Sequence, residues 1–160
     1  MKTIITMLTF FVLLNFASSA QTIDGFSFQK YPVKEVYKGS KAPLNFTGNA
    51  DAKAFRTRIK EGYKTGQVDF AGYYVTIYWG CGTGCSMGAM VDVRDGKIYT
   101  LPDNEENRTN YCGDGTTYGG KNNSRMYVTP ACGYNEENPK PVYTVFVWNE
   151  ISKKFKQVSK

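Results

Sequence analysis

Residues 70–100 read FAGYYVTIYWGCGTGCSMGAMVDVRDGKIYT, and this stretch decides the fold class. Aromatic and β-branched residues occupy both parities of 70–79, which is typical of a strand covered on both faces. After a glycine-rich connection, 86–93 alternates between larger apolar and smaller or polar side chains, which predicts a second strand. Asp95-Gly96 predicts a two-residue hairpin turn with positive φ at both positions, leading into a third strand over 97–101.

The same patterns extend in both directions from this stretch. Further strands are predicted over 31–37, 124–129, 142–148 and 154–158, and one helix over 50–62. Asn49 can cap that helix, Gly62 and Gly66 are expected to end it, and its solvated face carries Lys53, Arg56, Lys60 and Lys64. The sequence therefore predicts a mainly β (α+β) domain: a single antiparallel sheet, sandwich-like or barrel-like, with one helix in its N-terminal half.

The first twenty residues have the layout of a cleaved secretory signal. Lys2 is followed by an apolar run over 4–16 and by small residues at Ser18 and Ala20. The apolar run is shorter than the roughly 20 residues that a membrane span needs. We expect cleavage after Ala20, a single domain over 21–160, and a periplasmic or secreted location without a transmembrane segment.

Four cysteines remain in the exported part of the chain: Cys81, Cys85, Cys112 and Cys132. An even number in an oxidising compartment predicts two disulfides that staple the domain. We favour Cys81–Cys85, because the intervening Gly-Thr-Gly is flexible, together with Cys112–Cys132. The alternative crosses these two pairs. A disulfide-exchange protein using Cys81 and Cys85 is also conceivable, although the C-x-x-x-C spacing differs from that of redox motifs.

The chain contains no histidine, which excludes every catalytic triad and metal site that needs imidazole. An all-cysteine zinc site would need two close pairs, so we expect no metal and no cofactor. Carboxylates remain as acid–base candidates, and Asp69 and Asp92 border the strands next to the glycine-rich connection. If the protein is an enzyme, these two would be the catalytic residues of a hydrolase acting on an envelope or extracellular substrate.

The net charge of +6 on 160 residues is modest, and no dense basic patch predicts nucleic-acid binding. Two long loops, over 102–123 and 131–141, are long enough to be functional. With the 80–85 turn they would form a binding surface, in which we single out Tyr111, Tyr118, Tyr134 and Thr83. The favoured prediction is an exported binding domain, such as an envelope inhibitor, immunity or accessory protein, with a protein or glycan partner.

Several motifs also resemble those of one family. These are Phe70-Ala71-Gly72 with Tyr74 nearby, the run from Trp79 to Cys85, Val91-Asp92, and Gly96-Lys97-Ile98-Tyr99. Together they are similar to a family of small exported bacterial proteins with the signature F-A-G-x-Y … W-G-C-G-x-x-C … V-D … G-K-[VI]-Y. The resemblance covers about the last two-thirds of the chain. It implies the same fold, export and disulfides, and it implies no catalytic residue.

Overall fold

The computed structural model describes residues 22–82, 85–102, 119–131 and 141–159, with the backbone alone at 81–82 and 85–86. The elements in chain order are β1 (Thr22–Ile23), β2 (Phe26–Ser27), the short 3-10 helix η1 (Phe28–Lys30), α1 (Ala50–Ala54), α2 (Arg56–Thr65), β3 (Tyr74–Gly82), β4 (Cys85–Asp92), β5 (Ile98–Thr100), β6 (Gly119–Lys121), β7 (Ser124–Ala131), β8 (Val142–Asn149) and β9 (Lys154–Val158).

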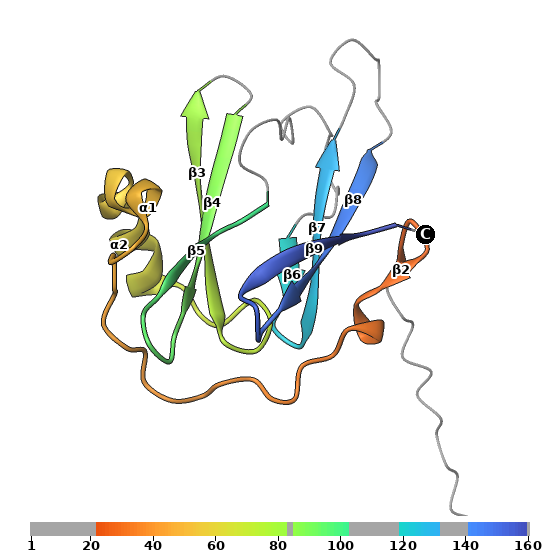
Figure 1. Cartoon of the computed structure of the whole chain (residues 1–160), viewed down its shortest axis with the longest axis horizontal. Helices are drawn as coiled ribbons and strands as arrows, with labels where there is room; N and C mark the ends of the chain where they lie inside the picture. The colour runs from red at the N-terminus through yellow and green to blue at the C-terminus, as the bar shows by residue number, and fades with distance from the viewer. Residues whose placement is uncertain (1–21, 83–84, 103–118, 132–140, 160) are drawn as a thin grey trace, which may run out of the picture.

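These strands form three antiparallel sheets, in the orders β1-β2, β3-β4-β5 and β6-β7-β8-β9. The predicted mainly β, antiparallel character is confirmed, although the described strands divide among three sheets instead of one. Figure 1 shows the two larger sheets next to each other, with α1 and α2 beside the β3-β4-β5 sheet. Among the described helices, none has the length and apolar character needed to cross a membrane.

The predicted helix is present but differs in its interior and at its end. Asn49 caps it as expected, since its Oδ1 accepts a hydrogen bond from the Ala52 backbone N–H at 2.8 Å. The helix is broken at Phe55, whose ring packs on Trp79 with ring centroids 4.9 Å apart. Gly62 does not end α2, which continues to Thr65 and is followed by Gly66. The missing Cβ of Gly62 instead lets the helix approach the side chain of Ile77.

The β3–β4 hairpin buries both faces, as the sequence predicted. Val75 pairs with Val91 and Ile77 with Ala89, and these side chains pack against Ile59 of α2 and its neighbours. On the opposite face, Tyr74 and Met90 pack against Tyr127 of β7 and Trp148 of β8 in the second large sheet. Phe70 and Leu101 belong to the same cluster. The hydroxyls of Tyr78 and Tyr127 also meet across the two sheets at 3.0 Å. The core between the sheets is therefore largely aromatic.

Two turns at one end of the first sheet differ from prediction. β3 begins at Tyr74, because Ala71 and Gly72 adopt φ of 45° and 80° and form a tight turn just before it. The predicted two-residue turn at Asp95-Gly96 is wrong. The Asp92 backbone N–H donates to the Lys97 carbonyl, so four residues connect the strands, and only Gly96 has positive φ.

The remaining strand predictions fall into two groups. Those for 124–129, 142–148 and 154–158 are confirmed as β7, β8 and β9, with β7 and β8 slightly longer than expected. The predicted strand over 31–37 is wrong. This segment makes one isolated bridge from Pro32 to Ser124 and a backbone hydrogen bond from Tyr37 to Gly72. It crosses the ends of both sheets instead of extending either one, so it cannot form a ladder.

Candidate functional site

Four charged side chains meet where the two large sheets end next to each other. Asp92 is the last residue of β4, and Arg94 lies in the connection to β5. Glu150 and Lys153 belong to the turn between β8 and β9. We call Asp92, Arg94, Glu150 and Lys153 the ion network. The Asp92 side chain is only 2% exposed, so its charge requires partners inside the protein.

Arg94 joins the two carboxylates of the ion network. Its Nε donates to Asp92 Oδ1 at 2.8 Å and its Nη2 to Asp92 Oδ2 at 2.5 Å, a bidentate arrangement. The same Nη2 also donates to Glu150 Oε1. The guanidinium lies 3.8 Å from the centre of the Tyr73 ring, which fixes its orientation through a cation–π contact.

Lys153 makes the second bridge between the sheets. Its Nζ donates to Glu150 Oε1 at 2.5 Å and lies 3.4 Å from Asp92 Oδ2. The other oxygen of Glu150 accepts hydrogen bonds from the Tyr74 hydroxyl at 2.7 Å and from the Trp148 indole N–H at 2.8 Å. Glu150 is therefore held by four side-chain donors, and the ion network is fully hydrogen-bonded on its acidic side.

These contacts decide the protonation of both acids. Burial disfavours the charged form of Asp92, but hydrogen bonds from Arg94 and the charges of Arg94 and Lys153 outweigh it, so the pKa of Asp92 is lowered. Burial likewise opposes ionisation of Glu150, and the donors from Lys153, Arg94, Tyr74 and Trp148 lower its pKa. Both carboxylates are thus ionised at neutral pH, and neither holds a proton for general-acid catalysis.

Asp69 lies in a different environment, just before the 70–73 turn. Its Oδ1 accepts from the Thr76 backbone N–H at 2.8 Å and its Oδ2 from the Thr76 hydroxyl at 2.5 Å. No Lys or Arg of the described chain forms an ion pair with it. Partial desolvation raises the pKa of Asp69, and the hydrogen bonds from Thr76 counter this only in part. Its contacts are those of a local cap on β3.

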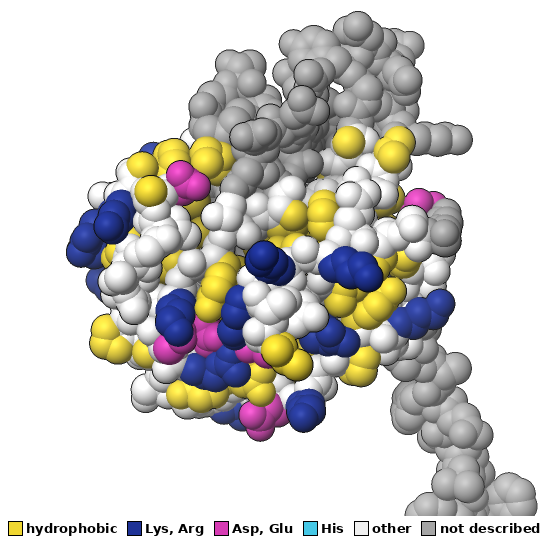
Figure 2. All heavy atoms as spheres, in the orientation of Figure 1, with side chains coloured by type: hydrophobic (Ala, Val, Ile, Leu, Met, Phe, Trp, Pro, Cys, Tyr) yellow, Lys and Arg dark blue, Asp and Glu magenta, His cyan; other side chains and the backbone are white. Residues whose placement is uncertain are grey.

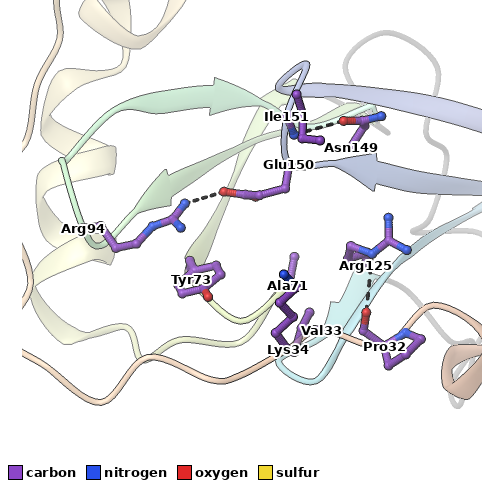
Figure 3. A pocket seen from close by; sticks show the side chains of 10 residues that line it. All are labelled: Pro32, Val33, Lys34, Ala71, Tyr73, Arg94, Arg125, Asn149, Glu150 and Ile151. Carbon is purple, nitrogen blue, oxygen red and sulfur yellow. Dashed lines mark hydrogen bonds and ion pairs between the residues drawn. The ribbon is translucent and has the colours of Figure 1, made fainter.

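A cavity of about 480 Å³ opens beside the ion network. Figure 3 shows Arg94 and Glu150 on one side of it and Arg125 on the other, with Tyr73 between them. The remaining lining residues come from the extended segment after η1, the 70–73 turn, the end of β8 and the β8–β9 turn: Pro32, Val33, Lys34, Ala71, Asn149 and Ile151. The volume lies in the range of small-molecule sites, and the lining combines apolar side chains with a few polar groups, as such sites do.

The backbone at this cavity is strained. Ala71 has φ of 45°, a conformation that side-chain-bearing residues seldom adopt, and its methyl group is buried. Lys153 of the ion network also has a positive φ, 52°. Strained residues persist where the surrounding structure over-determines them, and they concentrate at functional sites.

The structure separates the residues singled out from the sequence. Asp92 lies in the ion network and Asp69 bonds to Thr76, so no hydrogen bond joins the two predicted acids. The Cys81 and Cys85 thiols fall outside the described part of the chain, as do residues 1–20 and the other proposed disulfide and binding residues: Thr83, Tyr111, Cys112, Tyr118, Cys132 and Tyr134. The described cavity lies at the opposite end of the strands from Gly82, Cys85, Ala131 and Val142.

The sequence reasoning missed Arg94, Glu150 and Lys153 as site residues. Glu150 is 56 positions from Arg94, and only the packing of one sheet on the other brings them together. A signal was available, because Asp92-x-Arg94 and Glu150-x-x-Lys153 place opposite charges close together where predicted strands end. Tyr74 and Trp148 are buried in the core between the sheets, and their polar atoms donate hydrogen bonds to Glu150 of the ion network.

Figure 2 shows many basic side chains on the face in view, with a few acidic ones between them. The chain matches no protein-family model, no curated protein and no solved structure. The candidate functional site is therefore the ion network together with the cavity beside it.

Proposed function

We propose that this protein is an exported, disulfide-stapled domain that binds a ligand without chemically transforming it. The cavity beside the ion network is its ligand site. The observation that carries this proposal is the charge state of Glu150, which lines the cavity, and of Asp92, which lies beside it in the ion network. Four donors keep Glu150 ionised, and two cations keep Asp92 ionised. Such acids orient the surrounding side chains, and they have no proton to give to a leaving group.

The proposal keeps the family resemblance, the signal peptide and a periplasmic or secreted location as its premises. A protein of this kind fits the role of an envelope inhibitor, immunity or accessory protein. The aromatic core between the sheets and the ion network at their end give a rigid frame. A rigid frame favours binding, because little conformational freedom is lost when the ligand enters.

The alternative is a hydrolase that uses two carboxylates. It draws support from the proximity of Asp92 and Glu150, which share Arg94 and Lys153. A glycosidase-type mechanism, however, needs one carboxyl group that stays protonated near neutral pH, with a raised pKa. Here both pKa values are lowered. Asp69 has a raised pKa, but it is bonded to Thr76 and does not line the cavity.

A fragment screen by two-dimensional NMR on the 15N-labelled, oxidised exported protein tests the proposal. We expect fragments to shift amide signals of Tyr73, Arg94 and Ile151 and to be recovered unchanged. Val33→Trp should fill the cavity and abolish these shifts. Val36→Trp is the matched control, because Val36 lies in the same extended segment but does not line this cavity.

Two outcomes would overturn the proposal. One is a screen in which no fragment perturbs the cavity signals of the folded protein. The other is a ligand that the protein consumes, with the consumption lost in Asp92→Asn or Glu150→Gln variants that remain folded. That second outcome would establish the hydrolase.

A further inference from the structure

The two sides of the cavity differ in how their positive charges are compensated. On one side, Arg94 is neutralised by Asp92 and Glu150 and is bound to both. On the other side, the Arg125 guanidinium donates two long hydrogen bonds to the backbone carbonyls of Pro32 and Trp148, each at 3.4 Å. These carbonyls carry no net negative charge, so among the described residues no acid compensates the charge of Arg125.

Lys34 adds a second cation to the cavity lining. Its side chain is exposed, and within the described ranges no carboxylate lies within ion-pair distance of Lys34 or Arg125. Figure 3 shows Lys34 and Arg125 among the lining side chains, with Arg125 across the cavity from Arg94. A partly enclosed site with two cations that no described carboxylate pairs with attracts an anion more strongly than the open surface does, because solvent screening is weaker there.

Glu150, the one acid among the described lining residues, cannot serve as an ammonium site. Glu150 already accepts hydrogen bonds from Lys153, Arg94, Tyr74 and Trp148. A ligand ammonium would have to displace one of these donors, and two of them carry a positive charge. The lining therefore favours anions and disfavours cations and zwitterions.

Apart from Tyr73 and Asn149, the rest of the described lining is apolar. Val33 and Ala71 flank the cavity, and Ile151 at its edge is 97% exposed, so hydrocarbon placed there would remove its side chain from water. Each methylene group buried in this way contributes about 0.8 kcal/mol. A ligand that matches the site therefore has an anionic end and a short hydrocarbon body.

From this lining we infer that the cavity binds a small aliphatic carboxylate. Its carboxyl group accepts hydrogen bonds from Arg125, supported by the charge of Lys34, and its hydrocarbon lies against Val33, Ala71 and Ile151. Arg125 binds the ligand carboxylate, whereas Arg94 lines the opposite side and remains paired with Asp92 and Glu150. The inference rests on the proposed function, since it names the ligand class of the same site.

Matched probes test this inference directly: hexanoate, hexylamine and 1-hexanol, titrated by NMR at low salt. We expect hexanoate to bind with shifts at Arg125, Tyr73 and Ile151, and the amine and alcohol to bind at least tenfold more weakly. Arg125→Gln should weaken hexanoate binding about ten- to a hundredfold, the loss of a charge-assisted hydrogen bond. Arg58→Gln is the control, because it removes one positive charge from the exposed face of α2, away from the cavity.

The results separate this inference from the proposed function. Equal binding of the amine, or equal losses in Arg125→Gln and Arg58→Gln, would overturn the carboxylate site while leaving a binding domain intact. So would a screen in which neutral or cationic fragments bind the cavity and hexanoate does not. If no fragment of any charge binds, both fail. Lys34→Gln gives a second measurement should Arg125→Gln not fold, and it should weaken hexanoate binding several-fold.

Discussion

Two turns at the same end of the β3-β4-β5 sheet each have an aspartate beside them, and the pKa values of the two aspartates are shifted in opposite directions. Asp69, beside the 70–73 turn, has only hydrogen bonds from Thr76, and its pKa is raised. Asp92, at the start of the 93–96 connection, has Arg94 and Lys153, and its pKa is lowered. Asp69 is exposed, whereas the Asp92 side chain is only 2% exposed, yet Asp92 is the acid whose pKa is lowered. The cations beside Asp92 therefore outweigh the effect of its burial.

The largest expected effect comes from removing the charge of Asp92. Asp92→Asn leaves Arg94 and Lys153 facing a neutral amide beside the core, and we expect the free energy of unfolding to fall by about 3 kcal/mol, as for a broken buried ion pair. Urea unfolding at pH 7 measures it. A loss below about 1 kcal/mol would mean that the ion network does not hold the sheets together.

Glu150→Gln should cost less, about 1–2 kcal/mol. The glutamine keeps an acceptor for Tyr74 or Trp148, and Glu150 is 33% exposed, so water can solvate the cations that lose its charge. The double variant with Asp92→Asn separates shared from independent contributions, because both acids bind the same two cations. Strictly additive losses would contradict a coupled network.

The pH dependence of stability should distinguish the two aspartates by sign. Asp92 and Glu150 have folded-state pKa values below their unfolded values, so their contribution is present above about pH 4 and is lost as the pH falls further. Asp69 has a raised folded-state pKa, so its contribution is present below about pH 4 and is lost as the pH rises through the raised value.

Asp69→Asn sharpens this contrast with the smallest expected effect. At pH 7 we expect a change in the free energy of unfolding within about 0.5 kcal/mol, since Asp69 is exposed and the amide oxygen can still accept from the Thr76 backbone. Relative to the unmodified protein, the variant should gain stability as the pH rises above 4. Asp92→Asn should show the reverse trend, and thermal melts from pH 3 to 7 record both.

The same two turns show what the sequence could predict. Alternation and β-branched content located β4, β7, β8 and β9, because those signals are local. The connection between β4 and β5 was predicted to be too short. Its length is set by the backbone pairing of Asp92 with Lys97, which the Asp95-Gly96 dipeptide does not indicate. The break at Phe55 likewise follows from packing on Trp79, a contact across the fold.

The candidate site could be predicted from the sequence only in part, because it too depends on contacts across the fold. Asp92 was singled out by its place at a strand end. Its role depends on Glu150 and Lys153, which arrive through the packing of the second sheet. The uncompensated charge of Arg125 depends on which carboxylates lie near it in space, and no local pattern reports that.

The most direct test is a carbon-detected NMR titration of the side-chain carboxyl groups of Asp69, Asp92 and Glu150 in the folded protein. The account predicts that Asp92 and Glu150 titrate below their usual ranges and that Asp69 titrates above its own. If Asp92 or Glu150 instead keeps its proton up to about pH 6, the cavity holds a general acid, and the interpretation as a binding site without turnover is contradicted.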